Sequence, residues 1–151
     1  MTTALADLYR DVILAHSKQP RNFRQLEAPA VAAEEYNPLC GDTVVVYVEL
    51  AAGVVRAVAF QGQGCALSTA AASVMTEAVQ GRSVPEVGEM CVAFGTFMET
   101  GRALPAAMPD SLSAFAGVRA FPSRVKCTLL PWRALEAALR LLDGPRVHHL
   151  S

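Results

Sequence analysis

The stretch that decides the fold is Thr43-Val-Val-Val-Tyr-Val-Glu-Leu-Ala-Ala-Gly-Val-Val-Arg-Ala-Val-Ala-Phe-Gln61. β-Branched residues dominate it, and successive side chains of a strand point to opposite faces of a sheet. The first part therefore predicts a strand over 43–50, and the turn at 51–53 leads into a second strand over 54–61, ended by Gly62. The stretch predicts an antiparallel hairpin. The apolar face of its first strand consists of Val44, Val46, Val48 and Leu50.

Helical patterns surround this hairpin on both sides. The segment 18–35 before it is loop-like, with prolines as punctuation. One helix, a small antiparallel sheet and then only helices predict an α+β fold, in which the helices pack on one face of the hairpin, with or without a third strand. Apolar spacing, caps and prolines place the helices at 4–16, 66–80, 83–101 and 131–144, with a shorter one around 111–115.

Length and composition limit the class of protein. The 151 residues predict one domain, with 144–151 as a flexible tail. A hydrophobic content of 52% excludes a mainly disordered chain, and a net charge of −1 argues against a nucleic-acid partner. The sequence shows neither a signal-like start nor an apolar run of membrane-spanning length, so we expect a cytoplasmic protein with no membrane partner. In that reducing compartment, the four cysteines are candidates for metal ligands or reactive thiols.

The stretch Asn37-Pro-Leu-Cys-Gly-Asp-Thr43 carries the first candidate site residues, Cys40 and Asp42. In extended backbone, residues two apart point the same way, so this thiol and this carboxylate can reach one point in space. Gly41 between them tolerates unusual dihedral angles and leaves room for a ligand. A plain turn with no ligand is the alternative, unless the other cysteines converge here.

Two further cysteines also lie near the ends of predicted elements. Cys65 precedes a helix, where free N–H groups favour the thiolate, although a small buried residue at a packed corner explains the position equally well. Cys127 follows Arg124 and Lys126, which either favour its thiolate or form a surface basic patch. Cys91 lies in the apolar stripe of a helix, and we expect an inert core residue.

Together, Cys40, Asp42, Cys65 and Cys127 offer three thiolates and one carboxylate, a set that suits tetrahedral Zn²⁺ or an iron–sulfur cluster. A zinc ion with these four anionic ligands carries a net charge of about −2, which Arg124 and Lys126 could offset. His148 and His149 follow Gly144-Pro145 in the polar tail, where a disordered end and metal capture are both open.

Three motifs resemble the U-type iron–sulfur cluster assembly proteins, that is IscU, SufU and the N-terminal part of NifU. They are Asn-Pro-Leu-Cys-Gly-Asp at 37–42, Gly-Gln-Gly-Cys-Ala-Leu-Ser at 62–68 and Arg-Val-Lys-Cys at 124–127. The opening Leu8-Tyr9-Arg10 through His16-Ser-Lys-Gln-Pro-Arg-Asn22 is similar to the family's N-terminal signature. The resemblance implies a small α+β scaffold whose metal ligands are Cys40, Asp42, Cys65 and Cys127, with Arg124 near the metal.

Three departures favour the SufU branch of this family. Lys126 stands where IscU-type members have histidine, and Phe121-Pro-Ser-Arg-Val-Lys126 replaces their Leu-Pro-Pro-Val-Lys segment. The segment from Ser83 to Phe121 is also long. The departures argue against dependence on the IscU-type Hsp70 chaperone.

The resemblance implies two competing functions. A scaffold would take sulfur from a cysteine desulfurase of the SufS or IscS type and assemble a nascent [2Fe–2S] cluster from iron and sulfur on the four ligands, for transfer to apoproteins or carriers. A zinc-dependent sulfurtransferase would hold Zn²⁺ there and accept persulfide sulfur on Cys40. A zinc-stapled interaction module without chemistry is the weaker alternative, because a chain of this length needs no staple.

Overall fold

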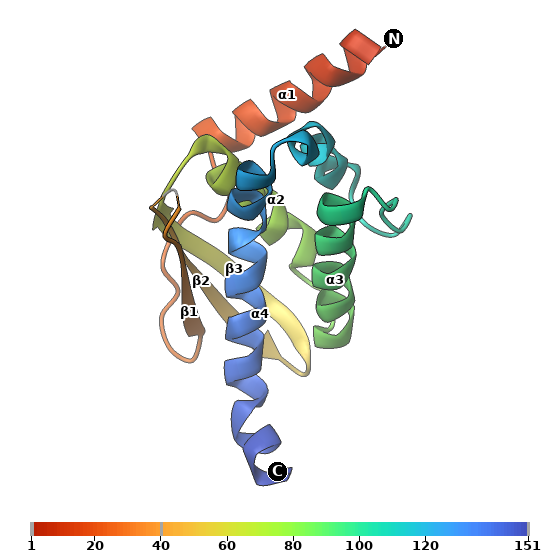
Figure 1. Ribbon diagram of the computed structural model, residues 1–151. Coiled ribbons are helices and arrows are strands. Elements are labelled where there is room, and N and C mark those ends of the chain that lie inside the picture. The colour runs from red at the N-terminus through yellow and green to blue at the C-terminus, as the bar shows by residue number, and fades with distance from the viewer. Residues whose placement is uncertain (1, 40, 151) are drawn as a thin grey trace.

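In the computed structural model, the backbone is described for residues 2–39 and 41–150, and the side chains for 9–39 and 41–142. The described chain forms a three-stranded antiparallel sheet and a set of helices, which lie on one face of the sheet (Figure 1). This arrangement confirms the predicted α+β class. The elements are α1 (Thr2–Lys18), β1 (Val31–Asn37), β2 (Asp42–Ala51), β3 (Val54–Gln63), α2 (Ala66–Val79), α3 (Val84–Thr100), the 3-10 helix η1 (Asp110–Ala120) and α4 (Pro122–Leu150).

The predicted hairpin of β2 and β3 is confirmed. The two strands pair antiparallel, with Val46 opposite Phe60 and Val48 opposite Val58. Both valines of β2 are fully buried, because their face of the sheet is the one that the helices cover. Burial of such side chains stabilises the fold by roughly 1.5–3 kcal/mol each. The buried face of the hairpin therefore forms the sheet side of the hydrophobic core.

β1 corrects the prediction of a loop over 18–35. It pairs antiparallel with β2 along the edge of the sheet, with Ala33 opposite Val46 and Asn37 opposite Asp42. Its sequence contains alanines and the acidic pair Glu34 and Glu35, residue types that are depleted in strands. Pairing with the strongly β-forming β2 overrides this weak propensity, and the acidic residues suit an edge strand.

Gly62 does not break β3, contrary to expectation. The strand continues to Gln63, and Gly62 lies opposite Val44. A Cβ atom at Gly62 would lie 2.2 Å from the Thr43 carbonyl oxygen, so the glycine marks a close approach of two backbones rather than a strand end. Residues 62 and 63 extend the sheet toward the start of α2.

The final helix begins earlier and ends later than predicted. α4 starts at Pro122, which suits the first position of a helix because a first-turn N–H needs no helical partner. Pro131, the predicted start, lies buried inside the helix. α4 then runs past Gly144 and Pro145 to Leu150. Pro131 therefore does not start the helix, Gly144-Pro145 does not end it, and the flexibility predicted for 144–151 stays a prediction.

The remaining helices agree with their local signals. Ser83 and Glu86 form the predicted capping box of α3, and Gly101 ends that helix in a left-handed conformation with φ 83°. The indole of Trp132 on α4 stacks on Phe94 of α3, with ring centroids 5.0 Å apart. Among the described residues, no helix combines the length and the apolar character that crossing a membrane requires.

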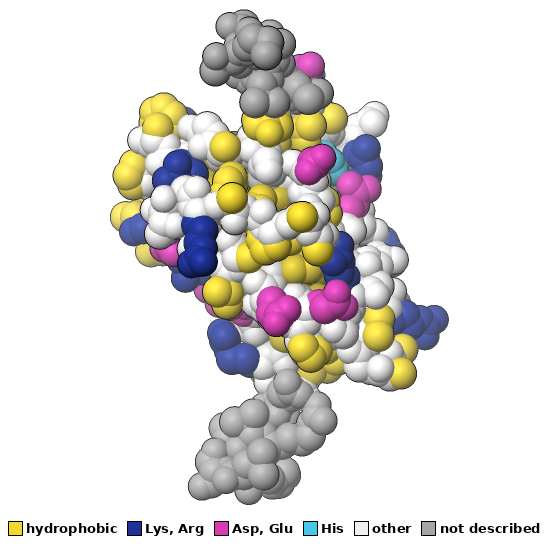
Figure 2. All heavy atoms as spheres, turned by 90° about the vertical axis from the view of Figure 1, so that its right-hand side faces the viewer, with side chains coloured by type: hydrophobic (Ala, Val, Ile, Leu, Met, Phe, Trp, Pro, Cys, Tyr) yellow, Lys and Arg dark blue, Asp and Glu magenta, His cyan; other side chains and the backbone are white. Residues whose placement is uncertain are grey.

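Figure 2 shows the face of the molecule that carries α3, where apolar side chains gather between charged ones. A groove of about 650 Å³ lies there, between α3 and the segment 102–105. Among the described ligand candidates, neither Asp42 nor Cys65 nor Cys127 lines this groove. It is bordered by Pro85, Gly88, Glu89, Val92, Ala93, Thr96, Arg102, Ala103 and Pro105.

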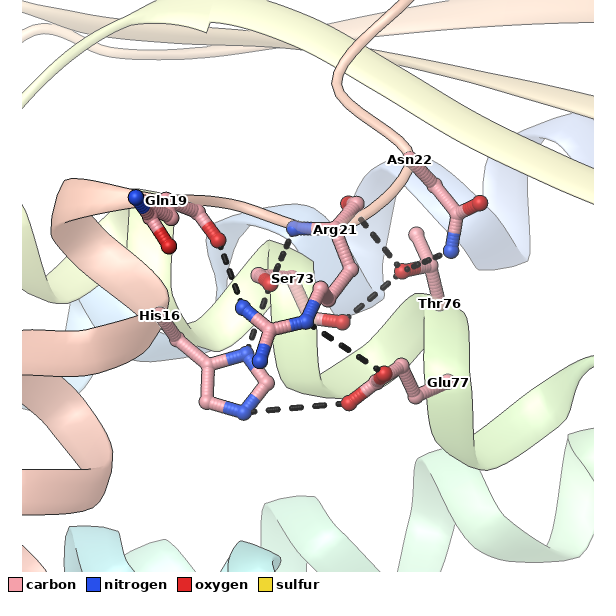
Figure 3. Close-up of polar contacts among 7 residues, drawn as sticks. All are labelled: His16, Gln19, Arg21, Asn22, Ser73, Thr76 and Glu77. Carbon is pink, nitrogen blue, oxygen red and sulfur yellow. Dashed lines mark hydrogen bonds and ion pairs between the residues drawn. The ribbon is translucent and has the colours of Figure 1, made fainter.

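A polar cluster joins the end of α1 to the middle of α2 (Figure 3). His16 Nδ1 lies 2.7 Å from Ser73 Oγ, and the backbone N–H of Arg21 donates to the same oxygen, also at 2.7 Å. Asn22 donates to Thr76 Oγ1 at 3.0 Å. His16 and Ser73 are buried, so their contact fixes the end of α1 against α2 where water does not compete, and the bonds of Arg21 and Asn22 fix the segment that follows α1.

Candidate metal centre

The structure brings three of the four predicted ligands together. One donor atom each from Asp42, Cys65 and Cys127 lie within 4.8 Å of one another. Asp42 begins β2, Cys65 immediately precedes α2, and Cys127 lies on the second turn of α4. The fourth predicted ligand, Cys40, lies outside the described residues, as do the side chains of His148 and His149.

A tight turn sets the position of Asp42. Asn37, at the end of β1, accepts the Leu39 N–H on its side-chain oxygen at 3.0 Å and the Gly41 N–H on its carbonyl oxygen at 2.8 Å. Gly41 has φ 78°, a conformation that glycine adopts without strain. This turn joins β1 to β2 and places Asp42 at the buried end of the sheet, 4% exposed.

The two carboxylate oxygens of Asp42 have different surroundings. Oδ1 accepts a hydrogen bond from the Cys65 backbone N–H at 3.2 Å. Oδ2 is buried and has no hydrogen-bond partner among the described groups. A buried carboxylate oxygen without a partner is costly, so a cation is the natural complement to this position.

Cys65 occupies the N-cap position of α2, in an extended conformation with φ −75° and ψ 169°. The expectation that it lies at the start of a helix is confirmed. Its side chain makes no cap hydrogen bond, although the first-turn N–H groups of a helix usually find one. The sulfur lies instead beside the Asp42 carboxylate and Cys127.

Cys127 is buried like Asp42 and is 5% exposed. It is fixed by the regular backbone of α4. Arg124 and Lys126, the predicted neighbouring cations, are on the same helix and both are exposed. Their positions one turn and one residue before Cys127 allow a long-range effect on the charge of the centre, screened by water.

Cys91 belongs to the hydrophobic core, as predicted. Burial raises the pKa of its thiol to about 12, and the nearby Glu136 carboxylate contributes in the same direction. Because the thiolate is the form that binds metal, this thiol stays protonated and inert at neutral pH.

The donor set fits a tetrahedral metal ion. Zinc–sulfur bonds of about 2.3 Å place the ligand atoms of a tetrahedral site about 3.8 Å apart. The three donor atoms all lie within 4.8 Å of one another, close to the spacing of such a site. Two sulfur atoms and one carboxylate oxygen leave one coordination position of a tetrahedral ion for a further ligand. Cys40 precedes Asp42 by two residues in the sequence and is the predicted fourth ligand.

Two residues of the centre were missed in the sequence. A Cβ atom at Gly64 would lie 2.5 Å from Ser68 Oγ and 2.8 Å from Asp42 Cγ, so a larger residue would require both side chains to shift. Ser68 Oγ donates to the Cys65 carbonyl oxygen at 3.1 Å. The spacing of Ser68 three residues after Cys65 was a signal, but the same spacing is common in helices without a site.

Comparison with known proteins places this centre in context. The family model described as the NifU-like N-terminal domain matches residues 8–128, which include all the candidate ligands. The zinc-dependent sulfurtransferase SufU of Bacillus subtilis (strain 168) is 34% identical over 140 residues, which cover 93% of this chain and 95% of that protein. The iron–sulfur cluster assembly scaffold protein IscU of Streptococcus pyogenes serotype M1 is 36% identical over 137 residues, 90% of this chain and 85% of that protein.

A solved structure agrees with the sequence matches. A protein of Fervidobacterium islandicum AW-1, assigned as a scaffold protein for iron–sulfur cluster assembly in the SUF system, superposes with a TM-score of 0.80 and 33% identity. The superposition covers 85% of this chain and 94% of that one. The resemblance read from the three cysteine motifs is therefore confirmed, and the chain belongs to the NifU-like N-terminal domain family, together with the SufU and IscU proteins of iron–sulfur cluster assembly.

Proposed function

We propose that this protein accepts sulfur for iron–sulfur cluster biogenesis at a metal centre formed by Cys40, Asp42, Cys65 and Cys127. The convergence of Asp42, Cys65 and Cys127 from three separate elements is the observation that carries this proposal. The relatives named SufU and IscU support it, because both match nearly the whole chain.

Zinc is the proposed resident ion, as in the name of the SufU relative. A bound Zn²⁺ would keep its cysteine ligands as thiolates and fix them in a tetrahedral frame. Asp42 contributes the oxygen that has no other partner, while its second oxygen holds the backbone of Cys65. The exposed cations Arg124 and Lys126 reduce the net negative charge near the ligands.

Cys40 is the proposed sulfur acceptor. Its thiolate attacks the terminal sulfur of a cysteine persulfide on a desulfurase of the SufS or IscS type. The sulfur–sulfur bond of the donor breaks, the donor cysteine leaves as a thiolate, and a new persulfide forms on Cys40. The sulfur moves without net oxidation or reduction, so the step needs no further reagent.

The surface around the turn suits a docking protein. Leu39 is 71% exposed, and Tyr36 and Phe121 are also exposed although they are large and apolar. Tyr36 lies at the end of β1, Leu39 lies in the turn that leads to Asp42, and Phe121 precedes α4. We propose that a cytoplasmic cysteine desulfurase docks here, and that apo iron–sulfur proteins or carriers take the product without the IscU-type Hsp70 chaperone.

A second function has its own support. A nascent [2Fe–2S] cluster, as cargo, could be assembled on the same four ligands before transfer. The mixed donor set favours this alternative, because one hard carboxylate among soft thiolates makes a cluster easier to release than four thiolates would. The IscU relative is named as such a scaffold.

Metal analysis and a sulfur-transfer assay together test the proposal. We expect freshly isolated protein to be colourless, with about one zinc per chain. With a cysteine desulfurase, cysteine and mass spectrometry of peptides, we expect persulfide on Cys40, lost in Cys40→Ala and kept in Cys91→Ala. Protein that carries iron–sulfur absorbance and no zinc as isolated supports the scaffold instead. Protein that accepts neither sulfur nor a cluster contradicts both.

A further inference from the structure

Cys65 is held through both of its backbone polar groups by side chains. Its N–H donates to Asp42 Oδ1 at 3.2 Å, and its carbonyl oxygen accepts from Ser68 Oγ at 3.1 Å. These two bonds lie on either side of the Cα atom and restrict the backbone angles of Cys65. The direction in which its sulfur points is thereby restricted as well.

Ser68 also lies near the sulfur itself. Its Oγ is 3.9 Å from Cys65 Sγ, within the range of a weak hydrogen bond to sulfur. Ser68 is 1% exposed, so water does not compete for its hydroxyl group. The same oxygen lies 2.5 Å from the position of a Cβ atom on Gly64, a residue that therefore needs to be glycine for Ser68 to come this close.

The orientation of Cys65 needs such support. A side chain at an N-cap usually turns back to the N–H groups of the first turn, and Cys65 does not. Its sulfur lies with donor atoms of Asp42 and Cys127, all within 4.8 Å of one another. A restraint on Cys65 therefore favours the orientation in which its sulfur faces the other two donor atoms rather than the first turn of α2.

We propose that Ser68 is a positioning residue of the metal centre. It holds Cys65 in the ligating orientation through the carbonyl group, and its hydroxyl oxygen lies 3.9 Å from the sulfur. The inference rests on the proposed function in one respect, that the cluster binds a metal ion. Ser68 is not itself a ligand, but it makes metal binding by Cys65 tighter.

Three variants test this role. Ser68→Ala removes the hydroxyl group, and Ser68→Thr restores it. Ser73→Ala is the matched control, because Ser73 is a buried serine of the same helix whose oxygen bonds His16 and the Arg21 N–H instead. Zinc affinity is measured anaerobically by competition with a chromophoric chelator. Cobalt(II) spectra report the coordination, and iodoacetamide labelling with mass spectrometry reports the reactivity of Cys65.

We expect Ser68→Ala to bind zinc about tenfold more weakly, as is typical when a group that orients a ligand is lost. Its cobalt(II) spectrum should change, and Cys65 of the zinc-loaded variant should be labelled faster than in the wild type. Ser68→Thr should restore all three. Ser73→Ala should lower the melting temperature through its α1 contacts and leave all three metal readouts unchanged.

Three other results would overturn either the positioning role of Ser68 or the metal centre itself. Wild-type zinc affinity, cobalt(II) spectrum and Cys65 labelling in Ser68→Ala overturn the positioning role and leave the metal centre standing. If Ser68→Ala does not fold, a Ser68→Thr chain that is folded and yet binds zinc tenfold more weakly overturns it too. A wild-type chain that binds neither zinc nor cobalt(II) overturns the metal centre itself.

Discussion

Asp42 Oδ1 accepts the backbone N–H of Cys65 at 3.2 Å, so the residue that begins β2 holds the residue that precedes α2. The turn before Asp42 is held by Asn37, and Asp42 is therefore not needed to cap its own turn. Its other oxygen, Oδ2, is buried without a partner among the described groups. One carboxylate thus combines a structural oxygen with an oxygen that can bind metal.

Substitutions of Asp42 separate these two roles. Asp42→Asn keeps an oxygen for the Cys65 N–H but loses the anionic ligand, so the metal-free protein should unfold close to the wild-type midpoint. Asp42→Ala leaves the part-buried N–H of Cys65 without this partner and should cost about 1 kcal/mol. Zinc should raise the melting temperature less in both variants than in the wild type. An equal rise in all three proteins, measured by calorimetry with and without zinc, would show that Asp42 is not a ligand.

If a cluster is the cargo, Asp42 also controls its release. The carboxylate is the one hard ligand among thiolates, and it is positioned to help ligand exchange. We expect Asp42→Ala, reconstituted anaerobically, to hold the cluster longer and to transfer it more slowly to an apo-ferredoxin than the wild type does. Transfer kinetics equal to those of the wild type, together with a lowered melting temperature, would reduce Asp42 to a structural residue.

Two glycines give a matched pair of substitutions. Gly64→Ala places a methyl group 2.5 Å from Ser68 Oγ and 2.8 Å from Asp42 Cγ, so both groups have to move away. We expect it to weaken zinc binding more than it lowers the free energy of unfolding. Gly88→Ala, on an exposed helical position with nothing within 4 Å, should stabilise the protein by about 0.5–1 kcal/mol. Zinc affinity equal in the two variants would contradict the close packing around Gly64.

Cys91→Ala tests the assignment of ligands at the one cysteine that is not assigned to the metal centre. Cys91 lies in the core, 6% exposed, and burial holds the pKa of its thiol at about 12. The substitution should cost about 1 kcal/mol of packing and leave zinc content and sulfur acceptance intact. Metal analysis of the folded variant is the check. A loss of zinc stoichiometry there would mean that a ligand has been misassigned.

Much of the fold could be predicted from the sequence because the signals were local. The hairpin over β2 and β3 is rich in β-branched residues, and the capping box at Ser83 marks the start of α3. β1 could not be predicted, because Glu34 and its neighbours have weak strand propensity and the strand exists only by pairing with β2. The start of α4 was misplaced because the prediction began the helix at Pro131, whereas Pro122 begins it.

The sequence was sufficient to predict those residues of the candidate site that carry metal-binding groups. Asp42, Cys65 and Cys127 carry donor atoms near predicted element ends, and the structure brings them together. Gly64 and Ser68 could not be found in the same way, because their importance depends on the position of Asp42, more than twenty residues earlier in the chain. A serine three residues after a helix start has no distinctive chemistry until such a neighbour is known.

His16 gives the protein a pH-dependent contact between α1 and α2. Burial lowers the pKa of its imidazole, and Arg21 acts in the same direction, whereas the Glu77 carboxylate, 3.7 Å away, opposes both. Burial is the largest of these effects, so the folded protein favours the neutral ring. In that form, the ring keeps its contact with Ser73 Oγ (Figure 3).

The direction of the pH effect on stability follows from this lowered pKa. The unfolded chain has the ordinary histidine pKa of 6.5, so it binds more protons than the folded chain once the pH falls below that value. The stabilisation from the neutral ring is complete above pH 6.5 and is lost progressively as the pH falls toward the folded pKa. We expect the wild type to lose more unfolding free energy between about pH 7.5 and about pH 5.5 than His16→Gln, which cannot take up this proton. Urea unfolding of both proteins at the two pH values measures the difference. A wild-type loss equal to that of His16→Gln would show that the histidine does not couple protonation to folding, because all other titrating groups are common to the two proteins.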